Sequence, residues 1–334
     1  MEEHPQAADE TPAPALDISP APHIWAGYLS TRGLMLDVVI AMAPLVGVAL
    51  WVFGLLAAKQ LLICVGTCLL AEAVFTAMRG RRATLLDFSA SVTGLILALS
   101  LPATAPWYVG AIGSVTAIGL GKVIFGGLGQ NIFNPAMVGR AFVMIAFASS
   151  MGASAYVAAN ADVPGAVTQA TPLTQVKMHE PVTAGLWDLL AGTHNGSLGE
   201  VSALACLAGG LYLCIRRTAS WEIPVGVLSA VAAIAGAWQL GHPQESWTML
   251  HHVISGAVLF GAFFIATDPV SSPLTPKGKF IFGLGVGSLV MVLRLFSGYP
   301  EGVMFAILLM NAVVPLINRW TIPKPVGGAV PVRK

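Results

Sequence analysis

Long apolar segments follow one another through this chain, and each is close to the ~20 residues that a helix needs to cross the ~30 Å hydrocarbon core of a bilayer. Hydrophobic residues make up 56% of the 334 residues, and charged residues make up only 10%. In soluble domains about a quarter of the residues are charged. The sequence therefore predicts an all-α integral membrane protein.

Ten such segments can be counted, five in each half of the chain. They are 34–55, 57–78, 87–103, 105–125, 134–150, 198–215, 222–240, 250–267, 279–296 and 301–318. An odd number per half turns the second copy over relative to the first, so the count suggests two inverted five-helix repeats. The expected organisation is a disordered tail (1–22), a first repeat (23–150), a loop (151–197), a second repeat (198–320) and a second tail (321–334).

A weak internal similarity accompanies this count. GLILALSLP, from Gly94 to Pro102, and GAFFIATDP, from Gly261 to Pro269, share the spacing of their glycine and proline and fall in the third and eighth segments. Chance recurrence of these two residue types in apolar helices is the alternative explanation.

Positive charges give the expected orientation. With the N-terminus inside, fourteen of the seventeen Lys and Arg residues, Arg140 among them, fall on the cytoplasmic side, and Lys59, Lys177 and Arg294 fall outside. Short cytoplasmic loops are enriched in Lys and Arg. We therefore expect both termini in the cytoplasm and the 151–197 loop outside.

The segment GKVIFGGLGQNIFNPA (121–136) is unusually polar and glycine-rich for its place between two apolar segments. Irregular backbone at membrane depth is tolerated only where protein buries it or where it lines a cavity. Asn131 and Asn134 offer amide groups suited to the edge of a planar heterocycle. The alternative is a tight turn in which Asn134 caps the helix that begins at Pro135.

Two further stretches interrupt the apolar pattern. TDPVSSPLTPKG (267–278) contains three prolines; its carbonyls and Asp268 could coordinate a cation or close a cofactor site, and a rigid cytoplasmic connector is the alternative. VTQATPLTQVK (167–177) is rich in threonine. Because Pro172 favours extended geometry at the preceding residue, we expect Thr171 to present its hydroxyl to a modifying enzyme.

Ionisable residues within apolar segments are candidates for function or for buried pairs. Glu72 is the clearest case, and Asp37, Asp87, Arg140 and Arg294 lie nearer the segment ends. The four cysteines fall in apolar runs and are interpreted as packing residues. A net charge of +1 gives no reason to expect a nucleic-acid partner.

Several of these motifs, in this order, resemble the RnfD/NqrB family of membrane subunits. They are SPAPH with STRGLM (19–35), DFSASVTGLILALSLP (87–102), GKVIFGGLGQNIFNPAMVGRAF (121–142), TQATPL (168–173), FFIATDPVSSPLTPKG (263–278) and YPEGVMFAILLMNAVVPLI (299–317). The short N-terminal tail is more similar to RnfD than to NqrB. The resemblance implies a subunit of the Rnf complex, which couples electron transport between ferredoxin and NAD to Na⁺ or H⁺ translocation across the bacterial inner membrane.

The resemblance also implies two flavins. FMN is expected as a phosphoester on Thr171, the last residue of Thr168-Gln169-Ala170-Thr171, attached by a flavin transferase. A second, non-covalent flavin, usually riboflavin, is expected beside Asn131 and Asn134.

Phe133 could stack on this second flavin, although an apolar residue at that position also fits a core role. The implied partners are other Rnf membrane subunits, one of them with its own FMN. A secondary transporter or channel with inverted repeats is the competing interpretation, and it gives no reason for the TQAT sequence.

Overall fold

The computed structural model describes residues 30–80, 85–151, 171–178, 184–192, 194–242, 247–299 and 301–323. Within these ranges the chain is helical, and the one β-type contact is an isolated bridge between Pro102 and Ser197. Thr168, Gln169 and Ala170, the predicted first tail and residues 324–334 of the predicted second tail lie outside the described residues. The all-α class expected from the sequence is confirmed over the described chain.

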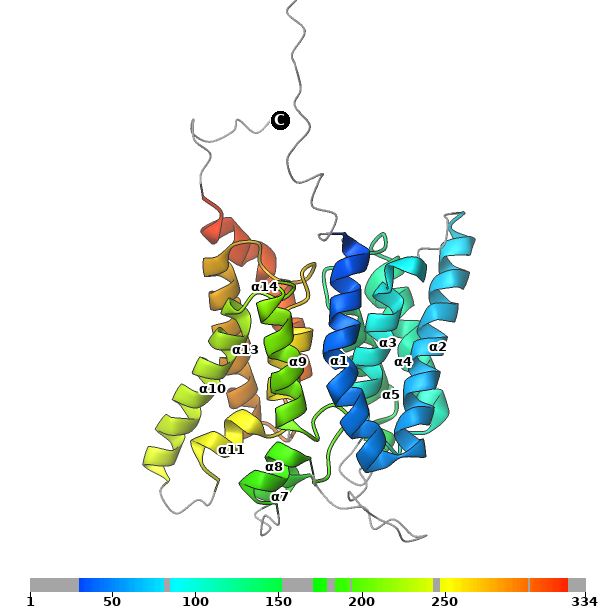
Figure 1. Cartoon of the computed structure of the whole chain (residues 1–334). Coiled ribbons are helices and arrows are strands. Elements are labelled where there is room, and N and C mark those ends of the chain that lie inside the picture. Colours follow the sequence, from blue (N-terminus) through cyan, green and yellow to red (C-terminus); the bar gives the residue numbers. More distant parts are fainter. Residues whose placement is uncertain are drawn as a thin grey trace, which may run out of the picture.

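The first half of the chain contributes helices on one side of the molecule (Figure 1). They are α1 (Thr31–Phe53), α2 (Leu55–Met78), the short η3 (Leu85–Asp87), α3 (Ser89–Ser100), α4 (Trp107–Ile118) with a π-helical turn η4 (Gly119–Val123), α5 (Pro135–Ala146) and α6 (Ala148–Met151).

The second half supplies the other side, after two short helices, α7 (Pro172–Lys177) and α8 (Leu186–Ala191). Its elements are α9 (Ala203–Ile215), α10 (Glu222–Gly241), α11 (Met249–Ile254), α12 (Val258–Phe260), a π-helical turn η6 (Gly261–Ile265), α13 (Pro276–Phe296) and α14 (Val303–Thr321).

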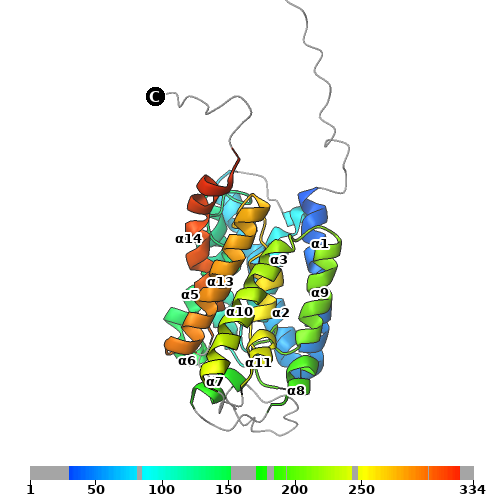
Figure 2. The same cartoon turned by 90° about the vertical axis from the view of Figure 1, so that its left-hand side faces the viewer.

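The two sides meet where α1 packs against α9 and α5 packs against α14. Both views show α7 and α8 at the end of the molecule opposite to the start of α1 and the end of α14 (Figure 1, Figure 2). The described part of the threonine-rich loop therefore lies at the opposite end from these two helix termini.

Helical structure occurs in each of the ten predicted segments, but the segments differ in length. Five helices in the described chain, α1, α2, α10, α13 and α14, are long and apolar enough to cross a membrane. The others are cut short by polar or glycine-containing breaks, as where Ser255 and Gly256 separate α11 from α12. The structure thus supports a multi-pass membrane protein, and the ten spans and inverted repeats stay predictions.

Close packing of α10 on α13 depends on glycines. A Cβ atom on Gly226 would lie 2.8 Å from the carbonyl oxygen of Phe280, and one on Gly283 would lie 2.5 Å from that of Ile223. Without side chains here the two backbones approach directly, as is common between membrane helices. Larger residues would force the helices apart.

We predict that Gly283→Ala lowers the free energy of unfolding by about 1–3 kcal/mol, the usual cost of overpacking. Gly47→Ala is the control, because nothing lies within 4 Å of the added methyl group. Equilibrium unfolding in mixed detergent micelles measures both. Equal stability of the two variants would contradict close backbone contact between α10 and α13.

Candidate functional site

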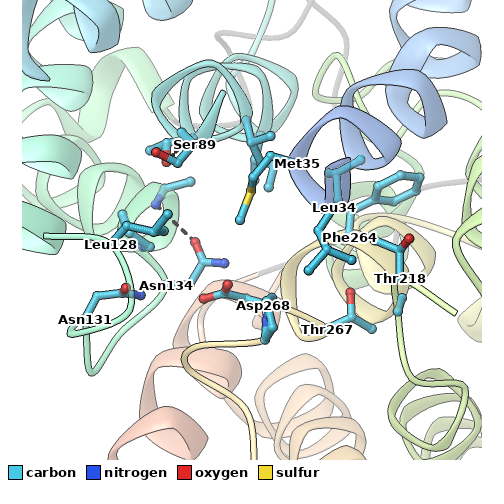
Figure 3. A pocket seen from close by; sticks show the side chains of 18 of the residues that line it. Leu34, Met35, Ser89, Leu128, Asn131, Asn134, Thr218, Phe264, Thr267 and Asp268 are labelled. Atoms are coloured by element: carbon cyan, nitrogen blue, oxygen red, sulfur yellow. Dashed lines mark hydrogen bonds between the residues drawn. The ribbon is translucent and has the colours of Figure 1, made fainter. Parts of the chain in front are cut away.

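A first cavity, of about 80 Å³, brings together the two polar interruptions of the apolar pattern (Figure 3). Asn131 and Asn134 come from the segment before α5, and Thr267 and Asp268 from the segment after η6. Leu34 and Met35, in the first turn of α1, complete the wall. The sequence identified both polar segments, and the structure shows that they share one cavity.

Asn134 is a helix cap whose side-chain hydrogen bonds serve the fold. Its Oδ1 accepts hydrogen bonds from the backbone N–H groups of Ala136 (3.0 Å) and Met137 (3.3 Å) at the start of α5. Its Nδ2 donates to the carbonyl oxygen of Ile265 (3.2 Å) at the end of η6. The capping role weighed from the sequence is confirmed, and the same side chain connects the two halves of the chain.

Asn131 differs from Asn134 because one of its side-chain polar atoms has no hydrogen-bond partner among the described residues. Its Nδ2 donates to the carbonyl oxygen of Phe133 (3.1 Å), whereas its buried Oδ1 has no hydrogen-bond partner among the described residues. A buried acceptor without a donor is costly. This oxygen therefore offers an acceptor to a ligand with an N–H group. The phenyl ring of Phe133 is half-buried and is not part of the described cavity wall.

Asn311 in α14 fixes the two polar segments relative to each other. Its Oδ1 accepts from the backbone N–H of Asn134 (3.2 Å), and its Nδ2 donates to the carbonyl oxygen of Ser271 (2.9 Å). Asp268 in turn accepts from the hydroxyl of Ser271 (2.7 Å). Asn311 was not among the residues predicted from the sequence. An amide side chain within the apolar sequence of α14 was the feature that could have marked it as a candidate.

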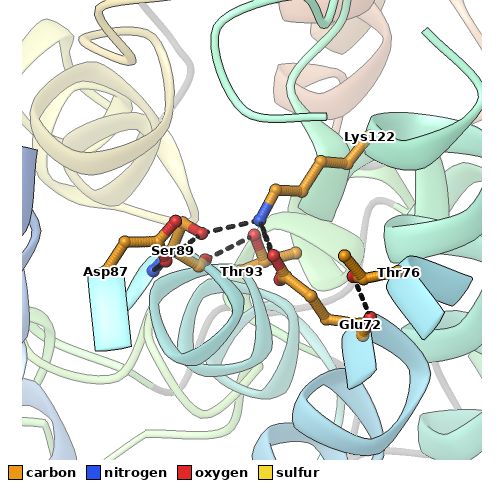
Figure 4. Close-up of polar contacts among 6 residues, drawn as sticks. All are labelled: Glu72, Thr76, Asp87, Ser89, Thr93 and Lys122. Carbon is orange, nitrogen blue, oxygen red and sulfur yellow. Dashed lines mark hydrogen bonds and ion pairs between the residues drawn. The ribbon is translucent and has the colours of Figure 1, made fainter. Parts of the chain in front are cut away.

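A buried ion pair borders the first cavity (Figure 4). Lys122 Nζ lies 2.7 Å from each carboxylate oxygen of Glu72 and 2.6 Å from the hydroxyl oxygen of Ser89. Asp87 accepts hydrogen bonds from Ser89, from its backbone N–H (2.8 Å) and from its hydroxyl (2.6 Å). Glu72, the most conspicuous charge in the sequence, is thus half of a pair that joins α2 to η4.

A second cavity, of about 260 Å³, contains Thr171. Its walls include residues from α5, from α7, from the connection that follows α13 and from the start of α14. Apolar side chains such as Met144, Leu173 and Met304 face charged ones, including Arg140 and Glu200. An apolar hollow with a few convergent polar groups is the usual form of a ligand site, although typical volumes begin near ~300 Å³.

Thr171 has the extended backbone predicted from the proline that follows it (φ −64°, ψ 155°). Its hydroxyl accepts from the backbone N–H of Thr174 (3.3 Å) and lies 2.8 Å from the Thr174 hydroxyl. Lys177, at the end of α7, donates to the carbonyl oxygens of Arg294 (3.1 Å) and Tyr299 (3.0 Å). The lysine thereby fastens α7 to the connection between α13 and α14.

The break between α11 and α12 is stabilised by a second ion pair. Arg294 donates to the carbonyl oxygens of His252 (2.7 Å) and Ser255 (2.9 Å) and lies 3.0 Å from a carboxylate oxygen of Glu301. Glu301 accepts from the backbone N–H of Ala257 (2.8 Å). The guanidinium thus binds backbone carbonyl groups at the end of α11, and the carboxylate binds a backbone N–H group at the start of α12, so that side chains satisfy groups that the helices leave without partners.

Gly256 sits at this break with a left-handed φ of +65°. A Cβ atom there would meet Glu301 and would lie 2.6 Å from the side chain of Leu173 and 2.9 Å from the guanidinium of Arg294. The position needs glycine for both its conformation and its space.

Arg140 lines the second cavity together with Thr171. It was predicted on the cytoplasmic side and Thr171 on the opposite side, yet the guanidinium of Arg140 lies 3.9 Å from Glu200 in the same cavity wall. The thirteen other Lys and Arg residues predicted on the cytoplasmic side still outnumber those predicted outside.

His194 also lines this cavity. Burial lowers the pKa of its imidazole, so the ring is neutral at pH 7.

Comparisons with known proteins are consistent across the whole chain. The model of the NQR2, RnfD, RnfE family matches residues 17–327. The chain is similar to a subunit of the "Na(+)-translocating ferredoxin:NAD(+) oxidoreductase complex" of Acetobacterium woodii, at 44% identity over 92% of this chain and 93% of the relative.

Two other relatives match at similar coverage. One is a subunit of the "Ion-translocating oxidoreductase complex" of Halorhodospira halophila (41% identity, 90% of this chain and 92% of the relative). The other is a subunit of the "Proton-translocating ferredoxin:NAD(+) oxidoreductase complex" of Clostridium ljungdahlii (38%, 93% and 96%).

We predict that Lys122→Met lowers the free energy of unfolding by about 3–5 kcal/mol, because it leaves the Glu72 carboxylate buried without its cation. The double variant Glu72→Leu, Lys122→Met recovers most of this loss, since no charge then remains buried. Lys277→Met, which removes an exposed lysine, is the control. Equilibrium unfolding in mixed micelles measures Lys122→Met, Glu72→Leu and the double variant. The pairing is contradicted if the free energy lost in the double variant equals the sum of the losses in the two single variants.

Proposed function

This chain belongs to the NQR2, RnfD, RnfE family, and from this premise we propose that it is a flavin-carrying membrane subunit of an ion-translocating oxidoreductase complex of the Rnf type. In this role it passes electrons between a partner subunit's flavin and a buried flavin, as part of electron transport between ferredoxin and NAD that is coupled to movement of Na⁺ or H⁺. The names of its relatives describe complexes of this class. The observation that carries the flavin part of the proposal is the cavity beside Thr171.

Thr171 is the proposed attachment residue for FMN through a phosphoester. The hydroxyl is half-buried at the edge of a cavity that continues into the protein, so a group attached to it can enter between apolar walls. Bound flavin supplies the electron-transfer chemistry, and the protein supplies position and electrostatics. Attachment requires a flavin transferase that acts on the extracytoplasmic side.

The first cavity is the proposed site of a second, non-covalent flavin, riboflavin or a relative of it. The unpartnered Oδ1 of Asn131 fits a ring N–H, while Asn134 holds the wall in place. At about 80 Å³ this cavity takes the edge of a ring and not a whole flavin. Phe133 remains a proposed neighbour outside the described wall.

Helix α5 contributes to the walls of both cavities. Ala136 lines the first cavity and Arg140 lines the second, and four residues of helix separate them by only about 6 Å along the helix axis. This proximity favours electron exchange between the two proposed flavins within one subunit.

We further propose a place in the bacterial inner membrane, with ten spans, both termini in the cytoplasm and Thr171 outside. The partners are the other membrane subunits of the complex, one of which carries its own FMN. Coupling to Na⁺ or H⁺ belongs to the assembled complex.

We predict that Thr171→Ala abolishes covalent flavin, because Thr171 is the last residue of the TQAT sequence, whereas the neighbouring Thr174, which lines the same cavity, lies outside that sequence. The full chain is produced in a host that contains a flavin transferase, and the denatured band is inspected for flavin fluorescence. Thr174→Ala is the matched control, and its band keeps the fluorescence although a hydrogen-bond partner of Thr171 is lost. Fluorescence that persists in Thr171→Ala would overturn the assignment.

A different variant tests the first cavity. Asn131→Leu removes a buried acceptor and should weaken non-covalent flavin binding about tenfold, or ~1.4 kcal/mol. Flavin released by denaturation is measured after purification, with the exposed neighbour Gln130→Leu as control. Unchanged content in Asn131→Leu, with the covalent band intact, would show that this segment serves only as a turn.

A further inference from the structure

Two ion pairs from four different segments lie at the Thr171 cavity, and Arg140, Glu200 and Glu301 line it. Arg140 of α5 lies 3.9 Å from Glu200, which precedes α9, and Arg294 of α13 lies 3.0 Å from Glu301, which precedes α14. Glu200 and Glu301 are close enough to interact electrostatically. The cavity surroundings therefore contain a connected group of two guanidiniums and two carboxylates.

The two pairs differ in how well their hydrogen bonds are satisfied. Arg294 and Glu301 have backbone partners on either side of the break between α11 and α12, so their role in the fold explains them, although Arg294 Nε has no hydrogen-bond partner among the described residues. Arg140 and Glu200 are farther apart than a hydrogen bond allows. Arg140 Nε and Glu200 Oε1 are both buried without a hydrogen-bond partner among the described residues.

Such an arrangement indicates a missing ligand. Arg140 is 7% exposed and Glu200 6% exposed, so bulk water does not compensate them. The hydroxyl of Ser255, 1% exposed, also lines the cavity without a partner among the described residues. A buried charged donor and acceptor side by side, with a hydroxyl in the same cavity, match a planar ring edge on which an N–H stands between two carbonyl groups.

We propose that Arg140 and Glu200 bind the pyrimidine edge of the flavin attached at Thr171. Glu200 accepts a hydrogen bond from the ring imide N–H, and Arg140 donates to the adjacent carbonyl oxygen. This inference rests on the proposed function, and it adds a role for two residues from distant parts of the chain.

The two charges have opposite electrostatic effects on such a ring. A positive charge favours the more negative, reduced state of a neighbouring group, and a negative charge disfavours it. Arg140 therefore raises the midpoint potential of the flavin, and Glu200 lowers it. A residue that merely supported the cavity wall would produce no such pair of opposite effects.

The test uses the full chain with its covalent flavin, purified in detergent and titrated potentiometrically while the flavin absorbance is followed. We predict that Arg140→Gln favours the oxidised form at least about tenfold, a fall of about 30 mV for a two-electron couple. Burial and the neighbouring Glu301 carboxylate raise the pKa of Glu200 to about 8, so the titration is made above that pH, where the carboxylate is ionised. Under that condition Glu200→Gln shifts the potential upward, and Arg140→Lys, which keeps the charge, restores most of the wild-type value. Lys59→Gln removes an exposed cation elsewhere and leaves the potential unchanged.

The in-gel fluorescence of each variant separates the two levels of the proposal. A missing covalent band in the wild-type chain contradicts attachment at Thr171 itself. An intact band with unchanged potentials, or with shifts of the same sign in Arg140→Gln and Glu200→Gln, overturns the inference about the ring edge. If Arg140→Gln does not accumulate, an unchanged potential in Glu200→Gln overturns it just as well.

Discussion

Every backbone amide at membrane depth must find its hydrogen-bond partner within the protein, and the described structure is organised around the places where helices fail to provide one. Asn134 satisfies the first amides of α5 and the last carbonyl of η6. Arg294 and Glu301 do the same for the break between α11 and α12. Each of the two cavities lies beside one of these breaks, where polar groups interrupt the apolar wall.

Much of the architecture follows from the sequence, because apolar length and proline position act locally. Helices occur in all ten apolar segments, and the extended backbone of Thr171 follows from Pro172. The shortening of α3 and the division of α11 from α12 were missed, since a hydropathy pattern does not register a three-residue break such as 255–257. At Gly256, whose φ is left-handed, an added Cβ atom would meet Leu173, Arg294 and Glu301 from three other segments, and the sequence does not reveal these neighbours.

The cavities were predictable only in part, for a related reason. Asn131, Asn134 and Asp268 stand out because amides and carboxylates are rare in apolar surroundings. The partner of Asn134, Asn311, lies more than a hundred residues away, and nothing in one sequence specifies that pairing. Arg140 was counted among the cytoplasmic charges, whereas in the structure it lines the Thr171 cavity, 3.9 Å from Glu200. A count of charges along one sequence does not specify this pairing.

Helix α5 touches both cavities within little more than one turn, between Ala136 and Arg140. An α-helix of this length behaves as a stiff rod, and its start is held by the cap that Asn134 provides. The helical backbone therefore fixes the positions of Ala136 and Arg140 relative to each other. The two cavities share one rigid wall.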